Sequence, residues 1–326
     1  MAMKRKIVVV EDDTSIPIQH ALDEFIAEKE ALNKSASTIN NYKQSVRLFM
    51  EYFEFNHETP ISEVKQKHFF EWANGLKLDY VKVTSINHYL RDCRAFFYWC
   101  MDEARGYIEK PFKIQTLDGQ DEGLKLFTKE ELDRLLEKPS RKPTAAAFTE
   151  WRTYAITNWI YATGNRVGTV IEVRIEDVDF TNREIHLRHT KNKKAQIIPL
   201  AASLDTVLKE YIRHFRNGVK KGWLFPNVGD EQLTTSALRQ AFSDYCKARN
   251  VSHANPHGLR HSFARAWIRN GGDTFRLQKI LGHSSLEMTR KYVKLFSEDL
   301  KEDFDTFNPL DTHKKAANRR KNINVD

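Results

Sequence analysis

The stretch HGLRHSFARAWIRNGG, residues 257–272, carries cationic side chains at helical spacing. His257 and Arg260 are three residues apart, so on a helix they project from one side and can reach the same anionic group. The pattern repeats at His261 and Arg265. An isolated pair of this kind is more often a solvated helix face, so further residues are needed before it indicates chemistry.

Residues of complementary chemistry surround this stretch in the second half of the chain. Arg166 follows the glycine-containing break of ATGNRVG, and Lys191 lies in a basic run. His283 directly follows Gly282, and Tyr292 comes nine residues after His283. The candidate catalytic residues are Arg166, Lys191, His257, Arg260, His283 and Tyr292.

Together these side chains meet the needs of one reaction. Guanidinium groups bind the oxygens of a phosphate and offset the charge that develops on it. A lysine can protonate a leaving oxygen, histidines can move protons, and a tyrosine can supply an oxygen nucleophile that forms a covalent intermediate. The set includes no carboxylate pair, metal-ligand cluster or phosphate-binding glycine loop. We therefore expect transesterification at a phosphodiester, with no metal and no other cofactor.

The composition fits a protein that binds a polyanion. The 326 residues carry 52 basic and 44 acidic side chains, a formal net charge of +8, which favours a polyanionic partner. Cys93, Cys100 and Cys246 lack metal-ligand spacing, so we expect reduced core residues. No apolar run has the length of a signal peptide core or a membrane span. These features predict no membrane association and a cytoplasmic location, at the nucleoid or wherever the DNA lies.

Apolar residues recur every three or four positions through the first third of the chain, which predicts amphipathic helices. Four such helices would form one unit. The stretch 107–123 contains proline, glycine and charges without periodicity, which indicates a linker. The expected helices cover about 21–25, 37–53, 64–72 and 86–101.

The second unit is predicted to be mixed. It opens at FTKEELDRLL, where Thr128 and Glu131 form a capping-box pattern that starts a helix. Two β-rich runs joined at Asn192, Lys193 and Lys194 predict a hairpin with a basic tip. Helices return from Thr234 onward, and the basic, apolar-poor end of the chain predicts a flexible or partner-docking tail.

The segments TGNR, HTKNKKAQIIPL, HGLRH, LGH and TRKYV follow one another along the chain. In order and separation they resemble the catalytic boxes of the tyrosine recombinase (phage integrase) family, which includes Xer-type recombinases and integrases of mobile elements. The resemblance covers about 124–300 and, more loosely, the helical N-terminal region. It implies a site-specific recombinase that cuts and rejoins duplex DNA, for the integration or excision of a mobile element or phage.

The resemblance also implies how the phosphate is held and attacked. Arg166 and Arg260 would hold the scissile phosphate. Tyr292 would attack it, leaving a 3′-phosphotyrosyl link and a free 5′-hydroxyl. The bond energy would stay in the protein–DNA ester, so neither ATP nor an obligatory metal would be needed.

The remaining candidates would handle protons and position the reacting groups. By the same resemblance, Lys191 would protonate the leaving 5′ oxygen, with Lys193 and Lys194 as fallback candidates. His257 would assist proton transfer. His283 would support the phosphate and position the tyrosine.

The implied fold is multidomain and mainly α. It would combine an N-terminal four-helix SAM-like core-binding domain with a mixed α+β catalytic domain that contains a small antiparallel sheet. The two domains would clamp duplex DNA, and no further arm-binding domain is expected ahead of the first helix. The predicted boundaries are 1–15 for an N-terminal extension, 16–106 for the core-binding domain, 107–123 for the linker, 124–303 for the catalytic domain and 304–326 for a C-terminal tail.

The implied partners are double-stranded DNA with specific recombination sites and further copies of this chain. A dimer would bind each site, and a homotetramer would assemble on two sites. Accessory directionality or DNA-bending proteins are further candidates. Exchanged C-terminal segments would use Phe304, Phe307 and Leu310 as anchors, unless the tail packs on its own protomer. Candidate DNA-binding residues are Lys43, Lys65, Lys67, Arg91, Lys193, Lys194, His261 and Arg265, the last two with support of the active-site helix as their alternative role.

One position departs from the family pattern. Members commonly carry an acidic residue three positions after the first arginine, where this chain has Thr169. Glu172 lies one turn later and could substitute. The departure concerns the bracing of the site more than its chemistry.

Two other functions share parts of the pattern. A type IB topoisomerase-like enzyme would use the same chemistry, but the separate helical domain and the tail favour recombination. A catalytically silent DNA-binding relative would not need all six catalytic candidates, and their retention argues against it.

Binding to duplex DNA should weaken steeply with salt, because neutralised phosphates release their counterions. With about six phosphate contacts, affinity should fall roughly 10³-fold between about 50 and 200 mM salt. Fluorescence anisotropy of a labelled duplex measures this slope. A flat response would argue against an extensive DNA clamp.

Overall fold

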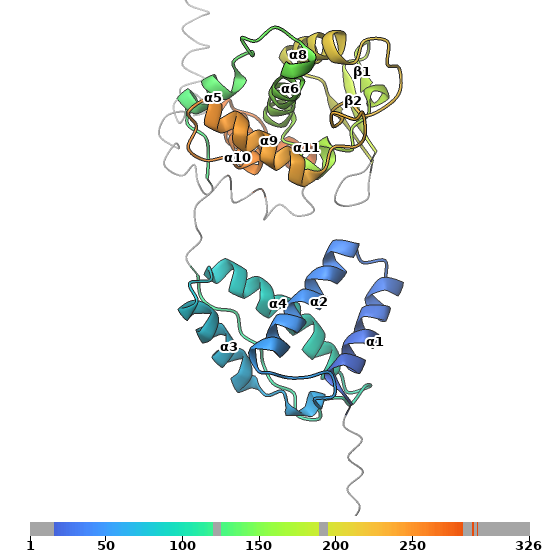
Figure 1. Cartoon of the computed structure of the whole chain (residues 1–326), viewed down its shortest axis with the longest axis vertical. Helices are drawn as coiled ribbons and strands as arrows, with labels where there is room; N and C mark the ends of the chain where they lie inside the picture. The colour runs from blue at the N-terminus through green and yellow to red at the C-terminus, as the bar shows by residue number, and fades with distance from the viewer. Residues whose placement is uncertain (1–15, 120–124, 189–194, 283–288, 290–291, 293–326) are drawn as a thin grey trace, which may run out of the picture. The chain divides into compact units, whose positions relative to one another are not determined.

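The computed structural model describes residues 16–119, 125–188 and 195–282, together with Thr289 and Tyr292. The chain divides into two compact units, Met1–Glu122 and Gly123–Asp326 (Figure 1). Each unit has its own hydrophobic core. The mainly helical architecture with a small antiparallel sheet in the second unit confirms the predicted fold class.

The first unit contains the four predicted helices, and aromatic rings form much of its core. Phe49 lies at the centre of these rings: it stacks on Phe69 with 4.7 Å between centroids, and it meets Trp72 and Phe97 edge-on. Such large side chains bury much apolar surface for each ordered residue. The helices are α1 (Ile18–Ala31), α2 (Ala36–Tyr52), α3 (Gln66–Leu78) and α4 (Val83–Cys100), with a short 3-10 turn at Ile61–Glu63.

The described part of the predicted linker packs on this first unit. Ile108 and Ile114 are buried in its core. The Asn87 side chain donates to the carbonyl of Leu117 at 2.9 Å and accepts from its N–H at 2.7 Å. Because this segment is irregular and is held by a few individual contacts, its apolar residues do not recur at a helical or strand period. Its sequence therefore resembles that of a free linker. Residues 107–119 therefore belong to the first unit.

The second unit is built around α6 (Phe148–Thr163), a helix that is buried on almost every side. Other helices of the unit pack around it, and α6 lies at the centre of the upper unit in Figure 1. Because large apolar side chains such as Trp151, Ile156 and Trp159 occur on different sides of α6, the helix needs neighbours around it to bury them. The packed helices are α5 (Lys129–Leu136), α8 (Ala202–Phe215), α9 (Thr235–Ala248) and α10 (Pro256–Arg269), and the shorter elements are α7 (Val167–Val170), α11 (Thr274–Leu281) and 3-10 turns at Ala145–Ala147 and Ile175–Asp177.

A three-stranded antiparallel sheet lies beside the helices, in the order β1 (Val178–Asp179), β2 (Glu184–Leu187), β3 (Gln196–Pro199). Ile185 pairs with Ile198, and both are buried. Their neighbours His186 and Ile197 pair with each other and are exposed, as expected for the two faces of a strand pair. The predicted hairpin is confirmed, while its basic tip lies outside the described residues.

Several local predictions are also confirmed. The Thr128 hydroxyl accepts from the N–H of Glu131 at 3.2 Å, and the Glu131 carboxylate accepts from the N–H of Thr128 at 2.9 Å. Cys93, Cys100 and Cys246 are all buried and unbridged. Within the described ranges, no helix combines the length and apolar character needed to span a membrane.

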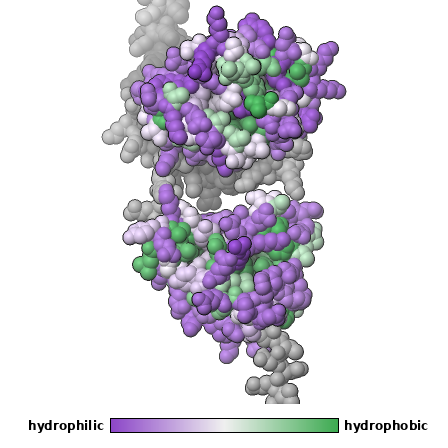
Figure 2. Space-filling view, in the orientation of Figure 1, coloured by the Kyte–Doolittle hydropathy of each residue, from purple (hydrophilic) through white to green (hydrophobic). Residues whose placement is uncertain are grey.

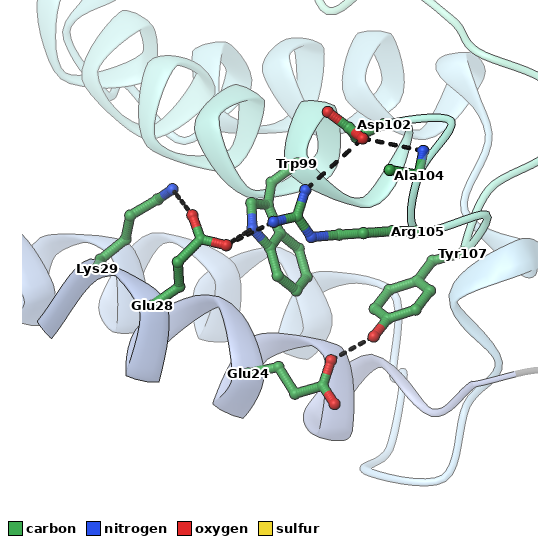
Figure 3. Close-up of polar contacts among 8 residues, drawn as sticks. All are labelled: Glu24, Glu28, Lys29, Trp99, Asp102, Ala104, Arg105 and Tyr107. Atoms are coloured by element: carbon green, nitrogen blue, oxygen red, sulfur yellow. Dashed lines mark hydrogen bonds and ion pairs between the residues drawn. The ribbon is translucent and has the colours of Figure 1, made fainter. Parts of the chain in front are cut away.

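A polar cluster fastens α1 to the end of α4 in the first unit (Figure 3). The Glu28 carboxylate accepts from Lys29 at 2.8 Å, from the indole of Trp99 at 2.7 Å and from Arg105 at 2.5 Å. The guanidinium of Arg105 also lies over the Trp99 ring, 4.2 Å from its centroid. These contacts, led by the hydrogen bonds from Lys29 and Trp99, lower the pKa of Glu28 from 4.5 to about 2.

Replacing Glu28 should destabilise the protein in a pH-dependent way. A lowered carboxyl pKa adds stability above the unfolded value near 4.5, and this contribution is lost as the pH falls toward about 2. The Glu28→Gln variant should therefore be less stable at pH 7, by at most about 1 kcal/mol because the carboxylate is partly exposed. Urea unfolding of the full chain, followed by tryptophan fluorescence, should show the difference shrinking at acid pH. Glu30→Gln, at an exposed position of the same helix, should show no such trend; an equal gap at pH 7 and pH 2.5 for Glu28→Gln would contradict the assignment.

Candidate active site

The position of Arg166 is set by the way α6 ends. The helix stops at Gly164, which has a left-handed backbone with φ 65°. A Cβ at this position would lie 2.5 Å from Phe263 and 2.6 Å from Leu281, so only glycine fits. The next residue, Asn165, is fixed because its side chain accepts from the buried indole of Trp159 at 2.9 Å. Arg166 follows as the residue that caps α7.

Arg260 projects from α10 and joins the C-terminal ends of two other helices. Its guanidinium donates to the carbonyl of Gly164 at 2.5 Å and to the carbonyl of Leu281 at 2.9 Å. These carbonyls end α6 and α11, where the helix dipoles are negative. Arg260 is only 4% exposed. Its position is therefore fixed by tertiary contacts rather than by solvent.

Tyr292 lies within the same cluster and is also 4% exposed. Its hydroxyl is 2.8 Å from Nδ1 of His261, and it forms a side-chain hydrogen bond with Arg260. The ring packs against a small apolar group that includes Phe263, Leu277 and Leu281. A phenolic oxygen and a guanidinium thus meet at one buried point.

The charges in this cluster favour the binding of an anion, and burial favours the neutral form of the Tyr292 phenol. Burial, followed by repulsion from Arg166, lowers the pKa of Arg260 to about 10, so the group stays charged at neutral pH. Burial also lowers the pKa of Arg166. For Tyr292 burial raises the pKa, while Arg260 and Arg166 counteract part of the increase. Two cations held close together at low solvent exposure can bind a phosphate well.

The structure brings together Arg166, Arg260 and Tyr292, which lie far apart in sequence. His257 lies on the same helix as Arg260, half-buried, at the second position after the Asn255 cap. Its charge is close enough to lower the pKa of His261. The predicted residues that lie outside the described ranges are Lys191, His283, Lys193, Lys194, Phe304, Phe307 and Leu310.

The position of the missing family carboxylate is not filled by Glu172. Thr169 lies on α7, and its N–H donates to the carbonyl of Arg166 at 2.9 Å. Glu172 is exposed, and its side chain forms no ion pair with any residue in the described ranges. Glu172 follows the short α7 and is exposed to solvent. Among the described residues Glu172 therefore does not brace the site, and Arg260 is held by backbone carbonyls.

His261 contacts the tyrosine. The sequence predicts support of the active-site helix or a phosphate contact for this residue, and in the structure its imidazole contacts the hydroxyl of Tyr292. Burial, then the positive charges of His257 and Arg260, lowers its pKa to about 4. Arg265 lies one turn further along α10 and is half-buried. The sequence pattern placed both residues near the site but could not tell which one faces the tyrosine.

Gln196 is a site-bordering residue that the sequence did not reveal. From the start of β3, its side-chain amide donates to the carbonyl of Lys279 at 2.6 Å and to that of Ile280 at 3.3 Å. It therefore ties the hairpin to the end of α11. No periodicity or motif marks a glutamine for such a role, because its two acceptors are backbone groups more than 80 residues away.

The DNA-binding candidates of the first unit are solvent-exposed. Lys43 lies on α2, Lys65 and Lys67 lie at the start of α3, and Arg91 lies on α4. Lys65 and Arg91 donate to backbone carbonyls of their own segments. Hydrophilic residues cover most of the face of this unit drawn in Figure 2. These side chains are accessible to phosphates.

Family comparisons agree with this geometry. Residues 125–299 match the phage integrase family, and residues 22–104 match the phage integrase N-terminal SAM-like domain. The chain belongs to the phage integrase family. It is a tyrosine recombinase, a site-specific DNA recombinase that acts through a covalent DNA–tyrosine intermediate without a metal.

Individual relatives cover most of this recombinase. Tyrosine recombinase XerC of Staphylococcus aureus strain NCTC 8325 is 26% identical over 305 residues, which are 92% of this chain and 98% of the relative. The Tn1549 transposon integrase in complex with transposon right end DNA has 21% identity and a TM-score of 0.69, covering 85% of this chain and 94% of its own. A lambda integrase tetramer bound to a Holliday junction has 18% identity and a TM-score of 0.66, covering 86% and 78%. The two structures share the fold of this recombinase.

Adding a methyl group at Gly164 should disturb the anchor of Arg260. Gly164→Ala combines a left-handed backbone with overlap against Phe263 and Leu281, which should cost roughly 2–4 kcal/mol of unfolding free energy. Displacement of the Gly164 carbonyl should also slow DNA cleavage. Urea unfolding and a single-turnover cleavage assay measure the two effects. The matched control is Gly168→Ala, because a Cβ there meets open space; equal losses for both variants would contradict the steric argument.

Proposed function

We propose that Arg166 and Arg260 bind the scissile phosphate of a recombination site and that Tyr292 is the nucleophile. The observation that carries this proposal is the shared buried cluster. In it the phenol of Tyr292 is hydrogen-bonded to the guanidinium of Arg260 and lies close enough to Arg166 for the charge of Arg166 to lower its pKa. Guanidinium groups placed in this way offset the charge that develops on a phosphorane-like transition state.

In the proposed reaction, Oη of Tyr292 forms a bond to phosphorus and the bond from phosphorus to the 5′ oxygen breaks. The product is a 3′-phosphotyrosyl ester and a strand that ends in a 5′-hydroxyl. Lys191 gives the leaving oxygen its proton, while His257 assists proton transfer and His283 supports the phosphate. A 5′-hydroxyl from the partner strand then reverses the step, so the ester conserves the bond energy.

We assign the protein to the integration or excision of a mobile element or phage. The Tn1549 integrase is bound to transposon end DNA, and lambda integrase occurs as a dimer on a core site and as a tetramer on a Holliday junction. By analogy, a dimer of this chain binds each site and a homotetramer joins two sites. The reaction takes place in the cytoplasm with the DNA, and accessory directionality or DNA-bending proteins are candidate partners.

A nicked duplex that carries the cognate site tests the nucleophile. Wild-type protein should become covalently attached to the DNA, because the short strand released by cleavage diffuses away and prevents religation. Tyr292→Phe should bind the duplex with unchanged affinity but form no adduct on a denaturing gel. Tyr161→Phe, a half-buried tyrosine packed against the same apolar group, should form the adduct normally. An adduct with Tyr292→Phe would move the nucleophile to another residue.

A further inference from the structure

His261 contacts the Tyr292 oxygen, which is the proposed attacking atom, yet the proposed mechanism assigns no role to His261. Its Nδ1 lies 2.8 Å from the Tyr292 oxygen, the ring centroids are 5.7 Å apart, and the imidazole is more than half buried. It comes directly after Arg260 on α10. Two consecutive residues of one helix therefore reach the same phenol, one with a cation and the other with an imidazole.

The hydrogen bonds at the phenol have a preferred direction. Arginine can only donate, so the Tyr292 oxygen accepts from Arg260. The phenol still carries its own proton. A neutral imidazole offers one acceptor nitrogen, and His261 stays neutral at physiological pH because burial, His257 and Arg260 all disfavour its charged form and lower its pKa to about 4. The O–H of Tyr292 can therefore donate to Nδ1 of His261.

We infer that His261 is the residue that accepts the proton of Tyr292 during strand cleavage. This inference rests on the proposed function, in which Tyr292 is the nucleophile. As Oη forms its bond to phosphorus, the O–H bond breaks and an Nδ1–H bond forms. The electron pair of the bond between phosphorus and the 5′ oxygen leaves with that oxygen, which Lys191 protonates. In the reverse step His261 returns its proton to the phenol.

The charges around His261 make this transfer depend on DNA. Without DNA, burial keeps the phenol of Tyr292 neutral although Arg260 and Arg166 oppose this effect, and burial keeps the imidazole of His261 neutral. A bound phosphodiester adds negative charge next to both groups. An opposite charge at this distance favours the imidazolium form, so the base becomes effective when the scissile phosphate is in place. The buried phenol of Tyr292 therefore keeps its proton and is unreactive until DNA binds.

Two variants separate proton transfer from positioning. In His261→Asn, Oδ1 can occupy the place of Nδ1 and accept the same hydrogen bond, but it cannot hold a proton at neutral pH. In His261→Phe both properties are lost. With the nicked duplex and saturating protein, both variants should form the covalent adduct roughly 10²- to 10⁴-fold more slowly, with DNA affinity within about twofold of wild type. A wild-type rate for His261→Asn would show that the contact only positions the phenol and would overturn the inference.

A second measurement tests whether the His261 variants lose proton transfer from the Tyr292 phenol or proton transfer to the leaving 5′ oxygen. A duplex with a 5′-bridging phosphorothiolate has a sulfur leaving group that needs no protonation. It should restore cleavage by Lys191→Ala but not by His261→Asn. In contrast, a fluorinated tyrosine at position 292, whose phenol ionises more easily, should restore His261→Asn at least tenfold. Restoration of His261→Asn by the phosphorothiolate would place His261 at the leaving group and overturn the inference.

Controls distinguish this inference from the proposed function. If wild-type protein forms no adduct, or Tyr292→Phe still forms one, the proposed function fails. If these two behave as expected while His261→Asn is unimpaired, only the role of His261 fails. His186→Asn, at an exposed position of β2, should leave the rate unchanged. Circular dichroism checks folding, and if His261→Asn does not fold, the phosphorothiolate and fluorinated-tyrosine tests are made with His261→Phe.

Discussion

Burial of the Arg260 guanidinium between two helix ends is the constraint on which the site depends. A buried arginine needs hydrogen-bond acceptors, because its desolvation is costly. The carbonyls of Gly164 and Leu281 provide them. Since these acceptors are neutral dipoles, they hold the side chain without cancelling its charge. The same two contacts fix the ends of α6 and α11 relative to α10, and so the surroundings of Arg166 and Tyr292.

The phenol of Tyr292, which we propose as the nucleophile, is buried beside the guanidinium of Arg260. Burial raises the pKa of Tyr292, while Arg260 and Arg166 oppose that increase. A buried neutral phenol is a poor nucleophile until a base and a bound phosphate are both present. His261 contacts the phenol from the side of α10. In the proposed mechanism, attack by Tyr292 is thereby coupled to the arrival of DNA.

The first unit has a different structural basis. Its core depends on aromatic rings around Phe49, and its outer helices are fastened by the carboxylate of Glu28. The exposed lysines and arginine on α2, α3 and α4 are thus carried by a rigid scaffold. Residues 107–119 complete this scaffold with Ile108 and Ile114. With a core of its own, the first unit holds these exposed side chains in place without help from the second unit.

The sequence by itself determined the four helices of the first unit, the helices from Thr234 onward, the β-hairpin, the capping box at Thr128 and the family, because these follow from local periodicity and ordered motifs. It also identified Arg166, Arg260 and Tyr292 as the residues to bring together. Only the tertiary structure decided that 107–119 packs on the first unit and that His261 faces the tyrosine. Such facts depend on contacts between segments distant in sequence, and a helix pattern specifies a face without specifying what packs against it.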